Sequence, residues 1–165
     1  MKCYTVIIET IKGSQAKYAY DEISHRFKLK KLLPAGMVFP FDFGFIEGTK
    51  GEDDAPLDMI IIAEFDNFPG SALDCRIIGA FKAEQKEAGK LIRNDRFIGI
   101  PAVSLLYSKV ISINDLPQIL LQQLEAFFEN YNKAEKKQFR VLQRVNAKKA
   151  CEIIDKNLKE NEVVK

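Results

Sequence analysis

The chain has 165 residues, of which 47% are hydrophobic and 29% charged, and its formal net charge is +2. This balance excludes a disordered, collagen-like or low-complexity chain and indicates a single globular domain over residues 1–165. Because no apolar run approaches the roughly 20 residues of a membrane-spanning helix and no signal-peptide pattern opens the chain, we expect a cytoplasmic protein without a membrane partner.

The first half of the chain has the pattern of β-strands separated by turns. Short runs rich in apolar, β-branched and aromatic residues predict the strands, and clusters of Gly, Pro and polar residues predict the turns. The expected strands are 4–10, 17–21, 27–33, 39–45, 57–63, 72–81 and 96–100. We expect polar loops at 48–56 and 84–94.

The second half changes to a helical period. Apolar residues recur at steps of three and four from Leu120 to Tyr131, and Pro117 suits the first turn of such a helix. A last strand is expected at 139–145, followed by a helix that Asn146 caps, and the tail 159–165 is expected to fray. Strands followed by helices favour an α+β fold with helices on a mostly antiparallel sheet or small barrel.

An acidic loop precedes the expected strand 57–63. Asp53, Asp54 and Asp58 lie within six residues. Carboxylates at the start of a strand suit a hard cation such as Mg²⁺. A solvated turn is the alternative interpretation of the same residues.

Other charged and reactive residues carry little signal. Residues 133–149 hold seven Lys or Arg against the single acid Glu135. Without interleaved exposed aromatics, we interpret this run as a solvated face and do not expect a nucleic-acid partner. The three cysteines have no metal-binding spacing, and the single histidine, His25, leaves little basis for a Ser-His-Asp triad.

Seven segments occur in an order and spacing that match one known family. They are Glu9–Ser14, Lys17–Asp21, Leu33–Met37, Phe39–Ile46, Pro56–Asp58, Asp115–Pro117 and Phe127–Tyr131. In these segments the chain resembles the soluble family I inorganic pyrophosphatases, with a slightly long stretch at 83–95. The resemblance implies a five-stranded OB-like closed barrel flanked by two C-terminal helices. It also implies Mg²⁺-dependent hydrolysis of diphosphate to two phosphates, and a homo-oligomer, commonly a hexamer.

The resemblance also implies roles for individual side chains. The substrate-binding positions are Lys17, Lys31 and Tyr131. The metal-binding candidates are Glu9, Asp53, Asp58 and the neighbouring Asp95. The catalytic candidates are Asp58, Arg96 and Asp54. Lys31 stands in place of a phosphate-binding arginine, and Arg96 stands in place of a lysine.

Four positions depart from the family pattern. Ala19, Ala55, Gln85 and Asn94 stand where the resemblance implies carboxylates, so three of seven such positions remain acidic. Fewer carboxylates can neutralise fewer metal ions, so we expect fewer Mg²⁺ ions and weaker metal binding. Asp54 and Asp95 lie one residue from lost positions, and they offer a way to rebuild part of the metal site.

These departures leave three functions open. The first is a diphosphatase with altered metal use. The second is a catalytically inactive protein of the same fold that binds an anion or a partner protein. The third is a hydrolase of another phosphorylated compound, because Phe39 and Phe43 replace two site tyrosines and make the site more apolar. We expect Phe41 and Phe45, in contrast, to belong to the core.

Overall fold

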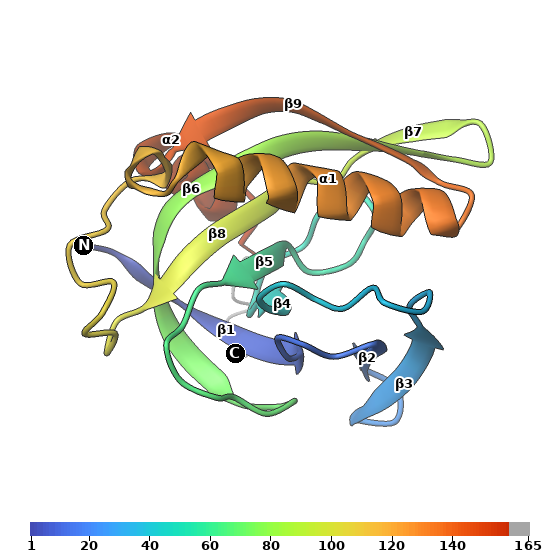
Figure 1. Cartoon of the computed structure of the whole chain (residues 1–165), viewed down its shortest axis with the longest axis horizontal. Helices are drawn as coiled ribbons and strands as arrows, with labels where there is room; N and C mark the ends of the chain where they lie inside the picture. Colours follow the sequence, from blue (N-terminus) through green and yellow to red (C-terminus); the bar gives the residue numbers. More distant parts are fainter. Residues whose placement is uncertain (159–165) are drawn as a thin grey trace, which may run out of the picture.

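The computed structural model describes residues 1–158, and the tail for which fraying was predicted, 159–165, lies outside them. Its elements follow the expected order of strands and then helices (Figure 1). The strands are β1 (Cys3–Thr10), β2 (Ala16–Asp21), β3 (Arg26–Leu32), β4 (Asp42–Ile46), β5 (Asp58–Ile61), β6 (Ala72–Glu87), β7 (Lys90–Arg93), β8 (Arg96–Pro101) and β9 (Gln138–Asn146). The helices are the short 3₁₀ helix η1 (Ile113–Asp115), α1 (Gln118–Ala134) and α2 (Ala147–Lys156).

Five strands form a closed ring. The sheet runs in the order β1-β4-β5-β8-β6, and β1 also pairs with β6, which closes it. All neighbours in the ring are antiparallel except β5 and β8, which are parallel. Strands β7 and β9 extend the sheet from the long strand β6, and β2 and β3 form a separate hairpin. The predicted α+β class with a five-stranded OB-like ring is therefore confirmed.

A hydrophobic core lies on each face of the ring. Successive side chains of a strand point to opposite faces, so each strand contributes to both cores. On β5, Met59 and Ile61 pack in one core, which α2 covers, while Ile60 packs in the other with residues of α1. Figure 1 shows α1 running alongside β9, which it contacts. Along the described chain no helix is long and apolar enough to cross a membrane.

The helix starts agree with the sequence signals. Ser112 and Asp115 form a capping box around η1, and α1 begins directly after Pro117. The side chain of Asn146 accepts a hydrogen bond from Lys149 N at 2.9 Å, which caps α2 as predicted.

The predicted loop at 84–94 is wrong, because these residues form a β-hairpin. Strand β6 continues to Glu87 and pairs with β7, with Glu87 opposite Lys90. Ala88 and Gly89 both have positive φ, at 49° and 78°, as a tight two-residue turn requires. The polar composition reflects the exposure of this hairpin rather than an absence of regular structure.

The assignment of the aromatic residues at 39–45 also needs correction. Strand β4 begins only at Asp42, because Phe39 instead pairs its backbone with Gly13 and Ser14. Phe39 and Phe43 are buried in the core at 2% and 4% exposure, and Phe41 and Phe45 are only partly buried. Phe43 packs against Phe128 of α1, whereas Phe45 lies opposite Asp58 and lines a pocket.

Candidate active site

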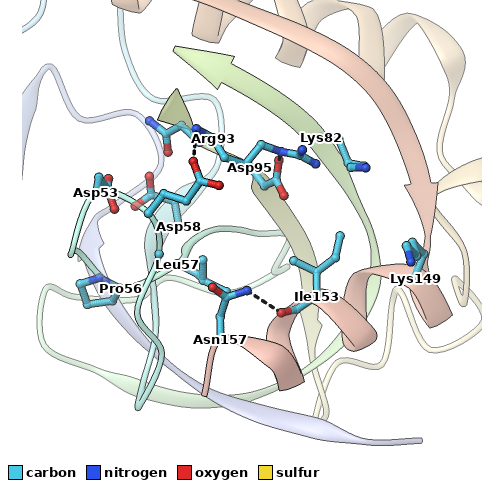
Figure 2. Close-up of a pocket in the computed structure, with 13 residues that line it drawn as sticks. Asp53, Pro56, Leu57, Asp58, Lys82, Arg93, Asp95, Lys149, Ile153 and Asn157 are labelled. Atoms are coloured by element: carbon cyan, nitrogen blue, oxygen red, sulfur yellow. Dashed lines mark hydrogen bonds and ion pairs between the residues drawn. The ribbon is translucent and has the colours of Figure 1, made fainter. Parts of the chain in front are cut away.

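Two adjoining pockets lie on either side of the acidic loop. The first, about 340 Å³, is lined by Glu9, Lys17, Ala19, Tyr20, Glu22, Phe45, Asp54, Ala55, Pro56 and Asp58. The second, about 310 Å³, is shown in Figure 2, with Asp53 and Asp58 near one end and Lys82 and Lys149 toward the other. Pro56 and Asp58 line both pockets, and Asp58 is the charged residue that they share.

Asp58 is paired with Arg96. The parallel register of β5 and β8 places the two residues side by side at the starts of their strands. Arg96 Nη1 donates to Asp58 Oδ2 at 2.6 Å and to Asn94 Oδ1 at 2.5 Å. The side chain of Arg96 is 5% exposed and that of Asp58 is 26% exposed. The Asp58 carboxylate is therefore already partly neutralised by a cation of the protein.

The amides next to this ion pair are joined to each other. Asn94 Nδ2 donates to Gln85 Oε1 at 2.7 Å, and Gln85 is buried. The neighbouring Asp95 faces a different group: its Oδ1 accepts from Arg93 Nε at 2.5 Å and from Ala83 N at 2.9 Å. Figure 2 shows this carboxylate together with Arg93. Asp95 is thus engaged by Arg93 rather than by the groups around Asp58.

The acidic loop holds its two aspartates differently. Asp53 Oδ1 accepts a hydrogen bond from Ala55 N at 3.1 Å, and burial raises the pKa of Asp53. Asp54 has a left-handed backbone, with φ at 63°, and its side chain is 84% exposed. An ion pair with Lys50 at 2.8 Å lowers the pKa of Asp54. The loop therefore turns Asp54 mainly toward solvent.

Glu9 and Lys17 face the first pocket from β1 and β2. Glu9 accepts a hydrogen bond from Tyr20 N at 2.8 Å, and burial raises the pKa of Glu9 to about 7. Burial lowers the pKa of Lys17. Because desolvation disfavours the charged form of both groups, an anion entering the pocket would stabilise the charge on Lys17.

Lys17 and Lys31 lie against the same aromatic ring. Their Nζ atoms are 5.3 and 3.9 Å from the centre of the Tyr131 ring. Lys31 also forms an ion pair with Glu135. Lys31, Glu135 and Tyr131 line a third pocket of about 230 Å³. The buried Tyr131 hydroxyl has no hydrogen-bond partner among residues 1–158, and burial raises the pKa of Tyr131 to about 12. The three predicted substrate-binding residues are thus brought together.

The predicted metal-binding residues do not gather in the same way. Within residues 1–158, no three His, Cys, Asp or Glu side chains are close enough together to hold a metal ion. Asp58 pairs with Arg96, and Asp95 pairs with Arg93. Glu9 lies in the first pocket, which Asp58 also lines but Asp53 and Asp95 do not. These donors do not fit a cluster of several Mg²⁺ ions, which would require adjacent carboxylates to offset the metal charge.

Two features of the site were missed by sequence reasoning. The Asp58–Arg96 pair depends on two strands 38 residues apart being neighbours, so no local signal could reveal it. Glu135, the partner of Lys31, had a usable signal, because it is the only acid in the basic run 133–149.

Comparisons with known proteins agree on one family. A family model described as inorganic pyrophosphatase matches residues 6–162. The chain is 36% identical over 132 residues to an inorganic pyrophosphatase of Sulfolobus acidocaldarius, covering 79% of this chain and 74% of the relative. It is 32% identical over 154 residues to that of Halalkalibacterium halodurans, covering 93% and 92%. The solved inorganic pyrophosphatase of Thermus thermophilus superimposes with a TM-score of 0.86 at 28% identity, covering 93% of this chain and 88% of that one.

Proposed function

The chain belongs to the inorganic pyrophosphatase family, and from this premise we propose that it binds inorganic diphosphate and hydrolyses it to two phosphates. The observation that carries this proposal is the convergence of Lys17 and Lys31 on the Tyr131 ring, whose buried hydroxyl has no hydrogen-bond partner within residues 1–158. Cations in a partly desolvated pocket bind a multiply charged anion more strongly than cations in water.

In this proposal the side chains have separate roles. Lys17 and Lys31 bind phosphate oxygens, and the Tyr131 hydroxyl donates a hydrogen bond to the same ligand. Asp58, at the start of β5, lines the pocket and is held by its ion pair with Arg96 at the start of β8. Asp54 and Asp95, which pair with Lys50 and Arg93, are left without a role in the proposal.

The divalent cofactor of the family enters the proposal as Mg²⁺, in a smaller number than the resemblance implies. Such an ion lowers the pKa of a bound water when it is present. Asp53 and Glu9 are two of the pocket-lining carboxylates that form no ion pair in the described chain, as are Glu22 and Glu52. One or two carboxylates suffice for an ion that keeps its waters and binds substrate phosphates.

A second candidate function is diphosphate binding without hydrolysis. Ala19 and Ala55 line the first pocket at positions where the family resemblance implies carboxylates. Asp58 is already engaged in an ion pair with Arg96. A missing general base commonly lowers a rate by about 10²–10⁴-fold. These observations are the ones that favour the second candidate, and a measurement of turnover separates it from the first.

We also propose a cytoplasmic homo-oligomer. The three free thiols, on Cys3, Cys75 and Cys151, suit a reducing compartment. Val103 and Leu105 are 74% and 84% exposed on the segment after β8, as residues at an interface between copies would be in an isolated chain. Size-exclusion chromatography with light scattering on the purified protein would determine the number of copies in the oligomer.

The test of turnover is phosphate release from diphosphate by the purified protein with Mg²⁺, Mn²⁺, Zn²⁺ or Co²⁺. We expect release with at least one metal, and its loss in Asp58→Asn. The matched control is Arg140→Gln, which removes an exposed charge on β9, away from the pockets, and should leave release unchanged. Absence of release with every metal would exclude hydrolysis and leave the second candidate.

A further inference from the structure

One nitrogen of Arg96 is surrounded by oxygen atoms. Nη1 lies 2.6 Å from Asp58 Oδ2, 2.5 Å from Asn94 Oδ1, 3.2 Å from Asp95 O and 3.4 Å from Asn94 O. This nitrogen carries two hydrogens, so four oxygens are more acceptors than it can satisfy well. A carboxylate, an amide oxygen and backbone carbonyls converging on one point are the ligand types that hard divalent cations use.

The guanidinium is held in this place by its surroundings. Three aromatic rings, those of Phe43, Phe128 and Phe139, have their centres 5.2–5.7 Å from the guanidinium carbon of Arg96. Arg96 is 4% exposed, and its Nε has no partner in the described part of the chain. A charge buried this deeply is stable only with its counterion, so Arg96 and Asp58 stay paired.

The residues around the pair leave little charge for a second cation. Gln85 and Asn94 offer amide oxygens, which carry no net charge, and one of these oxygens already accepts from Arg96. Asp95 is neutralised by Arg93. A divalent ion between Asp58 and Asp53, which lines the same pocket, would therefore share the Asp58 carboxylate with a guanidinium of the same sign.

We propose that the Arg96 guanidinium is a built-in cation that replaces a divalent ion beside Asp58, so that diphosphate binds to this chain whether or not it carries a metal ion. The identity of the ligand rests on the proposed function. Arg96 is a positioning residue in this proposal: it neutralises Asp58, and the anion can then approach Lys17 without repulsion from that carboxylate.

The binding test uses calorimetry with imidodiphosphate, a non-hydrolysable analogue, in excess EDTA and again in excess Mg²⁺. Wild type is expected to bind with comparable affinity in both. Arg96→Gln is expected to bind about tenfold more weakly in EDTA, because one charge that offsets Asp58 is lost. Arg96→Lys, which keeps the positive charge, should retain most of the affinity, and Arg140→Gln should match wild type.

A direct metal test separates this role from a purely structural one. Titration with Mn²⁺ followed by electron paramagnetic resonance should show no ion bound beside Asp58 in wild type or Arg96→Lys. Arg96→Gln should gain a bound ion, and added Mn²⁺ should restore its affinity for imidodiphosphate. If Arg96→Gln does not fold, the wild-type and Arg96→Lys measurements still decide the question.

The outcomes distinguish this inference from the proposed function. Suppose that the wild type binds imidodiphosphate only with Mg²⁺ and, in the separate turnover assay, releases phosphate from diphosphate. This result would overturn the role of Arg96 and leave the diphosphatase proposal intact. Binding in EDTA without phosphate release under any condition would support the role of Arg96 and remove hydrolysis. Absence of binding in both buffers would overturn both.

Discussion

The two halves of the site treat their charges in opposite ways. In the basic half, formed by Lys17, Lys31 and Tyr131, two cations lie against one ring and only Lys31 has an acid as an ion-pair partner in the described chain. In the acidic half, formed by Asp58, Asn94 and Arg96 with Gln85, every charge is neutralised within the protein. This difference is what the proposals above require: a site that binds an anion and has a reduced need for metal.

The two halves of the site also lie on different secondary-structure elements. Lys17 and Lys31 lie on the β2–β3 hairpin, which is separate from the main sheet, and Tyr131 lies on α1. Asp58 and Arg96 lie on adjacent strands of the closed ring, where register fixes their separation. The acidic half is therefore the more rigid one, and breaking its ion pair should cost more stability than changes in the basic half.

The largest effect is expected from Asp58→Asn. This change leaves the Arg96 charge buried without its counterion, so we expect a loss of about 3 kcal/mol in the free energy of unfolding, near the lower limit for buried pairs because Asp58 is 26% exposed. Urea unfolding followed by circular dichroism would measure it. The double variant Asp58→Asn, Arg96→Gln should recover most of the loss, and a double variant as unstable as Asp58→Asn would contradict the pairing.

A smaller effect of opposite sign is expected from Lys17→Met. The lowered pKa of Lys17 means that the folded protein disfavours its charge, so the variant should be more stable at neutral pH, by about 1 kcal/mol. Between the lowered pKa and 10.5, the unfolded chain binds more protons than the folded one, so wild-type stability rises with pH there. The advantage of Lys17→Met should therefore shrink as pH rises, as thermal unfolding across the alkaline range would show.

The same variant should lose affinity for imidodiphosphate, since it removes a cation that faces the pocket. Unchanged affinity would exclude Lys17 from the binding site. The basic half would then need a different assignment, because Lys17 is the residue that connects the first pocket with the Tyr131 ring.

The smallest stability effect is expected from Lys31→Met. Lys31 and Glu135 are 24% and 30% exposed, so losing their pair should lower the free energy of unfolding by only about 0.2–1 kcal/mol. Glu135→Gln is the matched control, because it breaks the same pair but keeps the cation. Calorimetry should show weaker imidodiphosphate binding for Lys31→Met and equal or tighter binding for Glu135→Gln. Equal losses in both variants would assign Lys31 a structural role only.

Much of the fold was predictable because its signals are local. Strand β1, helix α1 and the Asn146 cap each follow from residue periodicity or from one capping side chain. The hairpin at 84–94 was missed because its residues are polar and its turn, Ala88-Gly89, has a common residue at the first left-handed position. Which phenylalanines were buried was also missed, because it depends on tertiary neighbours: Phe43 packs against Phe128 of α1, whereas Phe45 lies near Tyr20 of the separate hairpin and lines a pocket.

By itself the sequence determined the order of the elements, the family resemblance and the loss of acids at Ala19, Ala55, Gln85 and Asn94, since each is a property of residue type and spacing. Only the tertiary structure decided what the remaining charges do. Asp58 and Arg96 are distant in the chain, and they meet because β5 and β8 are parallel neighbours in a closed ring. The partner of a buried charge is set by strand pairing and burial together, and neither can be read from a single segment.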